Sequence, residues 1–150
     1  MANQLVIQNS ITINASPEVV WDALTNPEQT RQYMFGCEAI TDWNVGSPLL
    51  WRGTHEGQEM IFVKGHIVAI EPGRSLVYTT IDPNSTIDDT SENYLTVTYD
   101  LAVEQGQTVL TVTQGDYTTV AEGARRYQEA VAEGGWASIL LAIKTLIEKP

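Results

Sequence analysis

The order of apolar and polar residues predicts strands along most of the chain, with helices near both ends. Over residues 3–14 apolar positions alternate imperfectly with polar ones, as in a strand that is buried on one face. These apolar positions are Leu5, Ile7, Ile11 and Ile13. The polar pair Asn9-Ser10 interrupts the alternation, so we place a candidate β-bulge there.

After this strand the apolar residues change to helical spacing. Ser16 suits the N-cap of a helix and Pro17 its first position, where a missing N–H costs nothing. We therefore expect a short helix to about Thr25. Asn26-Pro27 ends this helix, and a second short helix is expected over residues 28–33.

Six further strands follow, separated by turns rich in Gly, Pro, Asn and Asp. They are expected at about 38–44, 48–54, 59–71, 75–82, 93–104 and 107–115. Their short connections predict an antiparallel meander, because parallel neighbours need crossovers of about a dozen residues or more. The longest polar connection, residues 82–93, is expected to be a mobile loop.

The segment from about Val120 to Lys149 has a helical composition with one apolar stripe. The stripe consists of Trp136, Leu140, Ile143 and Ile147. Gly134 and Gly135 indicate a kink, a close approach of helix to sheet, or a break, and we favour one kinked helix. A curved sheet that grips such a helix leaves a gap under its middle, which predicts a cavity.

Four motifs resemble the START-like, Bet v 1-like (SRPBCC) superfamily. Residues 11–33, ITINASPEVVWDALTNPEQTRQY, are similar to the strand and helix pair that open its domains. Three later motifs resemble the AHSA1-like branch, the activator of Hsp90 ATPase homologue 1-like proteins. They are GHIVAIEPGRSLVYTT at 65–80, TVLTVTQGDY at 108–117 and GGWASILLAIKTLIE at 134–148. The resemblance extends over essentially the whole chain.

This resemblance implies a single domain, residues 1–150, with the α+β helix-grip fold. That fold has a curved antiparallel seven-stranded sheet, two short helices after the first strand, and a long C-terminal helix over the sheet. Relatives use the internal cavity for lipids, sterols, polyketides and other apolar molecules, and some relatives are enzymes. Thr80 stands where relatives often carry an aromatic residue and Gln114 where they often carry His, so one wall of the cavity would differ.

Composition narrows the classes of partner. Eight Lys and Arg against nineteen Asp and Glu leave a formal net charge of −11, which argues against nucleic-acid binding. The longest apolar run, residues 139–143, is far shorter than the roughly 20 residues of a membrane span. Cys37 is the single cysteine and the N-terminus lacks the features of a signal peptide, so we expect a cytoplasmic protein.

Strand alternation assigns the inward positions that would line a ligand cavity. The candidate ligand-binding residues are Trp51, Tyr78, Thr80, Tyr99, Leu110, Val112, Gln114, Trp136, Leu140 and Ile143. Tyr78, Tyr99 and Trp136 are equally explained as packing residues of the core. Arg52 is the basic group that would suit a ligand carboxylate. Residues 33–35 beside Gly36 form either a lid or a cover for the sheet.

The inventory for catalysis is small, and no catalytic residue, metal site or cofactor is expected. His55 lies at a turn, the face of His66 is undecided, and Cys37 has no basic partner near it in the sequence. The first hypothesis is therefore the binding of a small, mostly apolar molecule. The alternatives are a cyclase, dehydratase or hydrolase that uses the same cavity, and a partner protein of a chaperone, which we favour least. A homodimer is left open.

Overall fold

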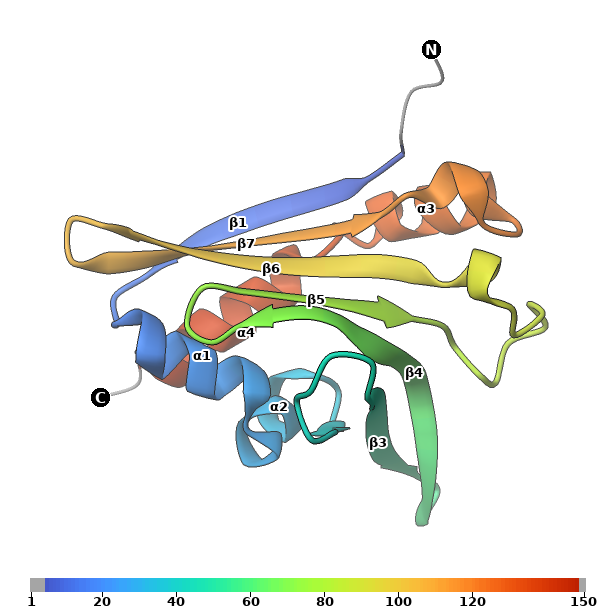
Figure 1. Ribbon diagram of the computed structural model, residues 1–150, viewed down its shortest axis with the longest axis horizontal. Coiled ribbons are helices and arrows are strands. Elements are labelled where there is room, and N and C mark those ends of the chain that lie inside the picture. Colours follow the sequence, from blue (N-terminus) through green and yellow to red (C-terminus); the bar gives the residue numbers. More distant parts are fainter. Residues whose placement is uncertain (1–4, 149–150) are drawn as a thin grey trace.

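The computed structural model describes residues 5–148, which form seven strands, four α-helices and two short 3-10 helices (Figure 1). In chain order these are β1 (Ile7–Ile13), α1 (Pro17–Thr25), α2 (Pro27–Tyr33), β2 (Glu38–Ile40), β3 (Pro48–His55), β4 (Gln58–Glu71), β5 (Ser75–Thr80), η1 (Ser91–Asn93), β6 (Leu95–Glu104), β7 (Gln107–Gly115), η2 (Tyr117–Thr119), α3 (Gly123–Ala132) and α4 (Ala137–Ile147). The predicted order of elements is confirmed, although the second strand ends at Ile40 and residues 91–93 are helical.

The strands form one antiparallel sheet in the order β1-β7-β6-β5-β4-β3-β2. Strands β2 to β7 follow one another as a meander, and β1 joins the far edge by pairing with β7. The α-helices α1 and α2 lie at one end of the sheet, and α4 crosses its concave face (Figure 1). This is the helix-grip α+β fold.

The curvature of the sheet is concentrated in β4. Figure 1 shows this strand bending from the plane of β5 into that of β3. Its pairing shifts register opposite Trp51/Arg52 of β3 and again between Ile67 and Ala69 beside β5. Such bulges increase local twist and bend the strand that carries them. The two ends of β4 therefore belong to differently oriented parts of the sheet.

The predicted bulge at Asn9-Ser10 is wrong. Each residue of β1 pairs in unbroken register with β7, from Ile7 opposite Gln114 to Ile13 opposite Thr108. Asn9 occupies a regular, half-buried inward position, where its side chain accepts a hydrogen bond from the backbone N–H of Trp136 at 3.0 Å. Asn9 interrupts the apolar pattern because its side chain bonds to the residue before α4, although the strand itself is regular.

Local capping fixes the two short helices where the sequence predicts them. Ser16 Oγ accepts from the N–H of Val19 at 3.4 Å, and Asn26 Oδ1 accepts from the N–H of Glu28 at 3.0 Å. A proline follows each cap at the first helical position. These side chains satisfy N–H groups that a helix start otherwise leaves unpaired.

The C-terminal segment is broken into α3 and α4, so the expectation of one kinked helix is wrong. The two helices differ in direction by 47°. Gly134 and Gly135 separate them with φ angles of +84° and +62°, a region that disfavours side chains other than glycine. A Cβ on Gly135 would lie 2.6 Å from Asn9 Oδ1. The second glycine therefore allows the start of α4 to approach β1 closely.

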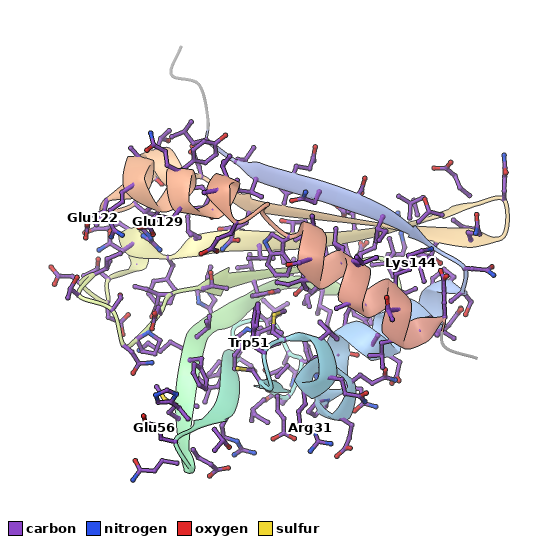
Figure 2. All side chains as sticks on the ribbon, turned by 180° about the vertical axis from the view of Figure 1, so that it is seen from behind. Arg31, Trp51, Glu56, Glu122, Glu129 and Lys144 are labelled. Carbon is purple, nitrogen blue, oxygen red and sulfur yellow. The ribbon has the colours of Figure 1, made fainter. Side chains whose placement is uncertain are left out.

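The middle of α4 packs directly on the sheet. Leu140 and Ile143 are 1% exposed, as the predicted stripe requires, and at the far end Lys144 Nζ donates to the carbonyl of Thr12 at 2.8 Å (Figure 2). Among residues 5–148 no single helix is long and apolar enough to span a membrane, and α3 and α4 reach that length and composition only as a bent pair.

Candidate functional site

A pocket of about 450 Å³ lies between the sheet and the start of α4. Its walls come from β1, β3 to β7, α3, α4 and the segment after α2. The lining residues are Ile7, Met34, Phe35, Cys37, Trp51, Phe62, Val63, Tyr78, Thr80, Val97, Gln114, Ala130, Glu133, Gly135, Trp136, Ser138 and Ile139. Most of these side chains are apolar or aromatic, and the volume falls in the range of small-molecule sites.

One row of the sheet forms the pocket floor. Tyr78 of β5 pairs with Val97 of β6, which pairs with Gln114 of β7, which pairs with Ile7 of β1. Neighbouring strands lie about 4.8 Å apart, so these four side chains stand side by side on the concave face. The register thus brings two polar residues, Tyr78 and Gln114, to either side of Val97.

Four aromatic rings connect the two sides of the pocket. The ring centroids of Trp51 and Tyr78 are 6.0 Å apart, those of Tyr78 and Tyr99 5.4 Å, and those of Tyr99 and Trp136 5.9 Å. The last two pairs meet edge to face, the arrangement that the ring quadrupole favours. The series holds the walls formed by β3, β5, β6 and α4 in a fixed relation. In Figure 2, Trp51 lies between the helices and the curved strands.

The hydroxyls of Tyr78 and Tyr99 form a buried pair with an oxygen separation of 2.6 Å. Burial raises the pKa of both phenols, and the negative charge of an ionised Tyr99 would raise the pKa of Tyr78 further. Tyr33, whose hydroxyl donates to the carbonyl of Ala23 at 2.8 Å, has its pKa raised by the same burial. All three phenols are therefore protonated at neutral pH.

Gln114 and Trp136 join β7 to the start of α4 beside the pocket. The indole Nε1–H of Trp136 donates to Gln114 Oε1 at 2.9 Å. The backbone N–H of Trp136 donates to Asn9, so both N–H groups of Trp136 are bonded to side chains of the sheet. Two contacts from different strands thus position the Trp136 ring at the pocket wall.

The segment after α2 contributes the edge of the pocket. Phe35 lines the pocket and is nevertheless 82% exposed, with a φ angle of +54°, and Gly36 follows at +81°. Met34 is half-buried, and Tyr33 is fixed in the core by its hydrogen bond. The exposed phenyl group places this segment at the rim, and a lid function stays a prediction.

The structure brings together half of the residues that the sequence predicts. Trp51, Tyr78, Thr80, Gln114 and Trp136 line the pocket, and Tyr99 lies behind Tyr78 without lining it. Four predicted residues are core residues with at most 1% exposure and do not line this pocket: Leu110, Val112, Leu140 and Ile143. The reason is the position of the cavity, which is at the start of α4, whereas these four residues belong to the hydrophobic core.

Sequence reasoning missed Phe62 and Val63, which both line the pocket although they are consecutive in β4. Strict alternation would send one of them outward. The register shift leaves Phe62 as the extra residue, because Trp51 pairs with Val63 and Arg52 with Ile61. The inward face of Gly53 makes room, since a Cβ there would lie 2.8 Å from the Phe62 ring. Cys37 also lines this region, and burial raises the pKa of its thiol.

Charged groups are nearly absent from the lining. Glu133 is the charged residue among the described lining side chains. Arg52, the predicted carboxylate partner, does not line the pocket and instead forms ion pairs with Glu38 at 3.6 Å and Glu59 at 3.7 Å. His66 is exposed on the outer face, where Nδ1 contacts the Thr79 hydroxyl. Residues 5–148 contain no group of three His, Cys, Asp or Glu that could hold a metal ion.

Comparison with known proteins gives the family. The family model described as Activator of Hsp90 ATPase homolog 1-like protein matches residues 14–148. Among solved structures, ChR145 from Cytophaga hutchinsonii is 32% identical with a TM-score of 0.77, over 99% of this chain and 97% of that one. A search of curated proteins finds no match.

Two more distant structures share the fold. The Aha1 dimer from Colwellia psychrerythraea is 18% identical with a TM-score of 0.68, over 96% of each chain. DynU16, from the dynemicin biosynthetic locus, is 15% identical with a TM-score of 0.70, over 98% of this chain and 48% of that one. The match to the family model covers most of the chain and agrees with the observed topology. The chain therefore belongs to the family of Activator of Hsp90 ATPase homolog 1-like proteins.

Proposed function

We propose that the protein binds a small, mostly apolar molecule in the pocket between the sheet and the start of α4. The observation that carries this proposal is a volume of about 450 Å³ with predominantly apolar walls and few polar groups. An apolar molecule that enters gains about 25 cal/mol for each Å² of surface removed from water. The likeness to a protein of a biosynthetic locus supports a small-molecule ligand.

The titratable groups of the lining favour binding over acid–base catalysis. Burial raises the pKa of both Tyr78 and Cys37, so neither supplies a base or a thiolate nucleophile at neutral pH. Glu133 lines the pocket from the end of α3, next to the glycines that precede α4. A cytoplasmic location and a homodimer stay predictions of the sequence.

A thermal-shift screen with apolar aromatic compounds and lipids tests the proposal. Ligand at a hundredfold excess over its Kd stabilises the protein by about 2.7 kcal/mol, which corresponds to a rise in Tm of several degrees. Thr80→Trp fills the pocket and should abolish this rise, because Thr80 is part of the lining. Thr96→Trp is the matched control, since Thr96 is exposed on the opposite face of the neighbouring strand.

A rise in Tm that Thr96→Trp keeps and Thr80→Trp loses supports binding in this pocket. An equal rise in both variants would place the ligand elsewhere on the protein. No rise in the wild-type protein with any compound of the screen would contradict the proposed function.

A further inference from the structure

The orientation of the Gln114 amide is fixed by chemistry. The indole Nε1–H of Trp136 is a hydrogen-bond donor without acceptor capacity, so the atom 2.9 Å from it must be the amide oxygen of Gln114. The amide NH₂ group then points away from the indole. Gln114 is the penultimate residue of β7 and pairs with β1 on one side and with β6 on the other, so both neighbouring strands fix its backbone.

The Gln114 NH₂ group has donor capacity that the protein does not use. Within residues 5–148 no acceptor binds Nε2. If Nε2 were fully buried it would be a buried nitrogen without a hydrogen bond, and among the described residues only Arg52 Nε is in that position. The Gln114 nitrogen is thus accessible, and the space that this inward-facing residue lines is the pocket. Two amide N–H donors are therefore available to a bound molecule.

The Tyr78 hydroxyl lies two strands away from Gln114 and is engaged with the Tyr99 hydroxyl, and either oxygen can be the donor of that bond. Among the described lining residues, the Gln114 amide is therefore the polar group of the pocket floor whose donors are left free.

The charge of the lining limits what the acceptor can be. The described lining contains the carboxylate of Glu133 and no Lys or Arg, so a ligand carboxylate or phosphate would enter without a counter-ion. Removing such an anion from water without a partner is strongly unfavourable. A neutral acceptor such as a carbonyl oxygen satisfies the same donors and brings no charge.

We propose that the pocket selects a neutral, mostly apolar ligand by a carbonyl oxygen that accepts a hydrogen bond from the Gln114 amide. This inference rests on the proposed function and names the ligand class. Gln114 is then the residue that selects the ligand, and Trp136 orients its amide group. Val97, which pairs with Gln114 on the neighbouring strand, provides the apolar floor on which the body of the ligand lies.

The test compares 9-fluorenone with fluorene, two tricyclic molecules of nearly the same shape that differ by the carbonyl oxygen. We expect the wild-type protein to bind fluorenone about tenfold more tightly, the effect of one or two well-formed neutral hydrogen bonds. The infrared carbonyl band of bound fluorenone should lie at lower wavenumber than in an apolar solvent. This band is measured on the wild-type protein, so it does not depend on how a variant folds.

The variant Gln114→Met removes the amide donors at similar side-chain length. It should bring the fluorenone-to-fluorene ratio close to one, whereas the loss of the Trp136 contact should lower both affinities alike and leave the ratio unaffected. Gln8→Met is the matched control on the same sheet, because Gln8 is exposed on the outer face of β1. Retained fluorene binding shows that each variant is folded.

The outcomes separate the two proposals. Equal binding of fluorenone and fluorene to the wild-type protein, with no shift of the carbonyl band, overturns the carbonyl inference and leaves the apolar pocket supported. A preference that Gln114→Met retains also overturns the inference. If neither fluorenone nor fluorene binds, and no compound of the thermal-shift screen raises the Tm, both the proposed function and this inference are overturned.

Discussion

At the scale of residues, the interior of the pocket is organised by hydroxyl and amide groups that are bonded in pairs. Tyr78 pairs with Tyr99 and Gln114 with Trp136, and the four residues come from three strands and a helix start. Each pair satisfies polar groups that would otherwise be costly to bury. The same pairing leaves donor capacity toward the pocket, so stability and ligand recognition depend on the same side chains.

The variant Tyr99→Phe tests the buried hydroxyl pair. Phe keeps the ring and its contacts but leaves the Tyr78 hydroxyl without its partner, so the free energy of unfolding should fall by about 1–3 kcal/mol. Urea unfolding measures the change. Tyr127→Phe is the control, because Tyr127 is half-buried and its ring meets that of Tyr117 edge to face with a centroid distance of 5.6 Å. Equal stability of Tyr99→Phe and the wild-type protein would show that the pair contributes nothing.

The raised pKa values of Tyr33, Tyr78 and Tyr99 predict a loss of stability in alkali. In the unfolded chain these phenols ionise near pH 10, whereas in the fold they keep their protons to higher pH. Their contribution to the free energy of unfolding is therefore complete below pH 10. It is lost as the pH rises above 10, by about 1.4 kcal/mol per pH unit for each buried phenol.

Urea unfolding at pH 8, 9, 10 and 11 measures this dependence. The free energy of unfolding should change little between pH 8 and 9 from this cause and fall steeply above pH 10. In Tyr33→Phe the fall of the free energy of unfolding with pH above pH 10 should be less steep, by the contribution of one phenol. A slope that Tyr33→Phe does not change would contradict the assignment of the loss to buried tyrosines.

At the scale of elements, the break between α3 and α4 decides where the pocket lies. Gly134 and Gly135 turn the chain, and the approach of Gly135 to β1 lets Asn9 accept a hydrogen bond from the N–H of Trp136, the residue before α4. If the helix continued, its residues would cover the end of the sheet where Ser138 and Ile139 now line the pocket. The glycines and Asn9 thus act together, although they are far apart in the sequence.

A matched pair of glycine variants tests this arrangement. Gly134→Ala has no atom within 4 Å of the new Cβ and should pay only the cost of a positive φ angle, about 1–2 kcal/mol. Gly135→Ala has the same backbone cost and also displaces Asn9 and Ile7, so it should be less stable than Gly134→Ala by about 1 kcal/mol, the contribution of one hydrogen bond. Chemical denaturation of both variants provides the comparison. Equal losses would mean that the contact with Asn9 has no energetic weight.

Sequence patterns predict those elements whose signals are local. Ser16 and Asn26 cap helices from their own segments, and the turns of the meander carry their own turn residues. The exceptions depend on partners distant in sequence. Asn9 resembles a defect in a strand until α4 is placed against it, and Phe62 faces inward only because of the bulge opposite Trp51/Arg52. No periodicity within a segment carries that information.

At the scale of the whole molecule, the curved sheet and the two C-terminal helices enclose a pocket at one end and a packed core at the other. The sequence predicts a cavity but places it under the middle of the helix, where Leu140 and Ile143 are in fact buried against the sheet. Strand alternation predicts Trp51, Tyr78, Thr80 and Gln114 as pocket residues, and the helical apolar stripe predicts Trp136. The position of the pocket required the three-dimensional bend of β4 and the break before α4.

The central claim is that an apolar molecule binds between the sheet and the start of α4, and the tryptophans test it most directly. The four indole N–H groups give separate signals in a ¹H–¹⁵N spectrum, and Trp51 and Trp136 line the pocket whereas Trp21 and Trp43 do not. During titration with fluorene, the account predicts saturable shifts of the Trp51 and Trp136 signals and unchanged signals of the other two. Saturable shifts confined to Trp21 or Trp43, or none at any indole, would contradict it.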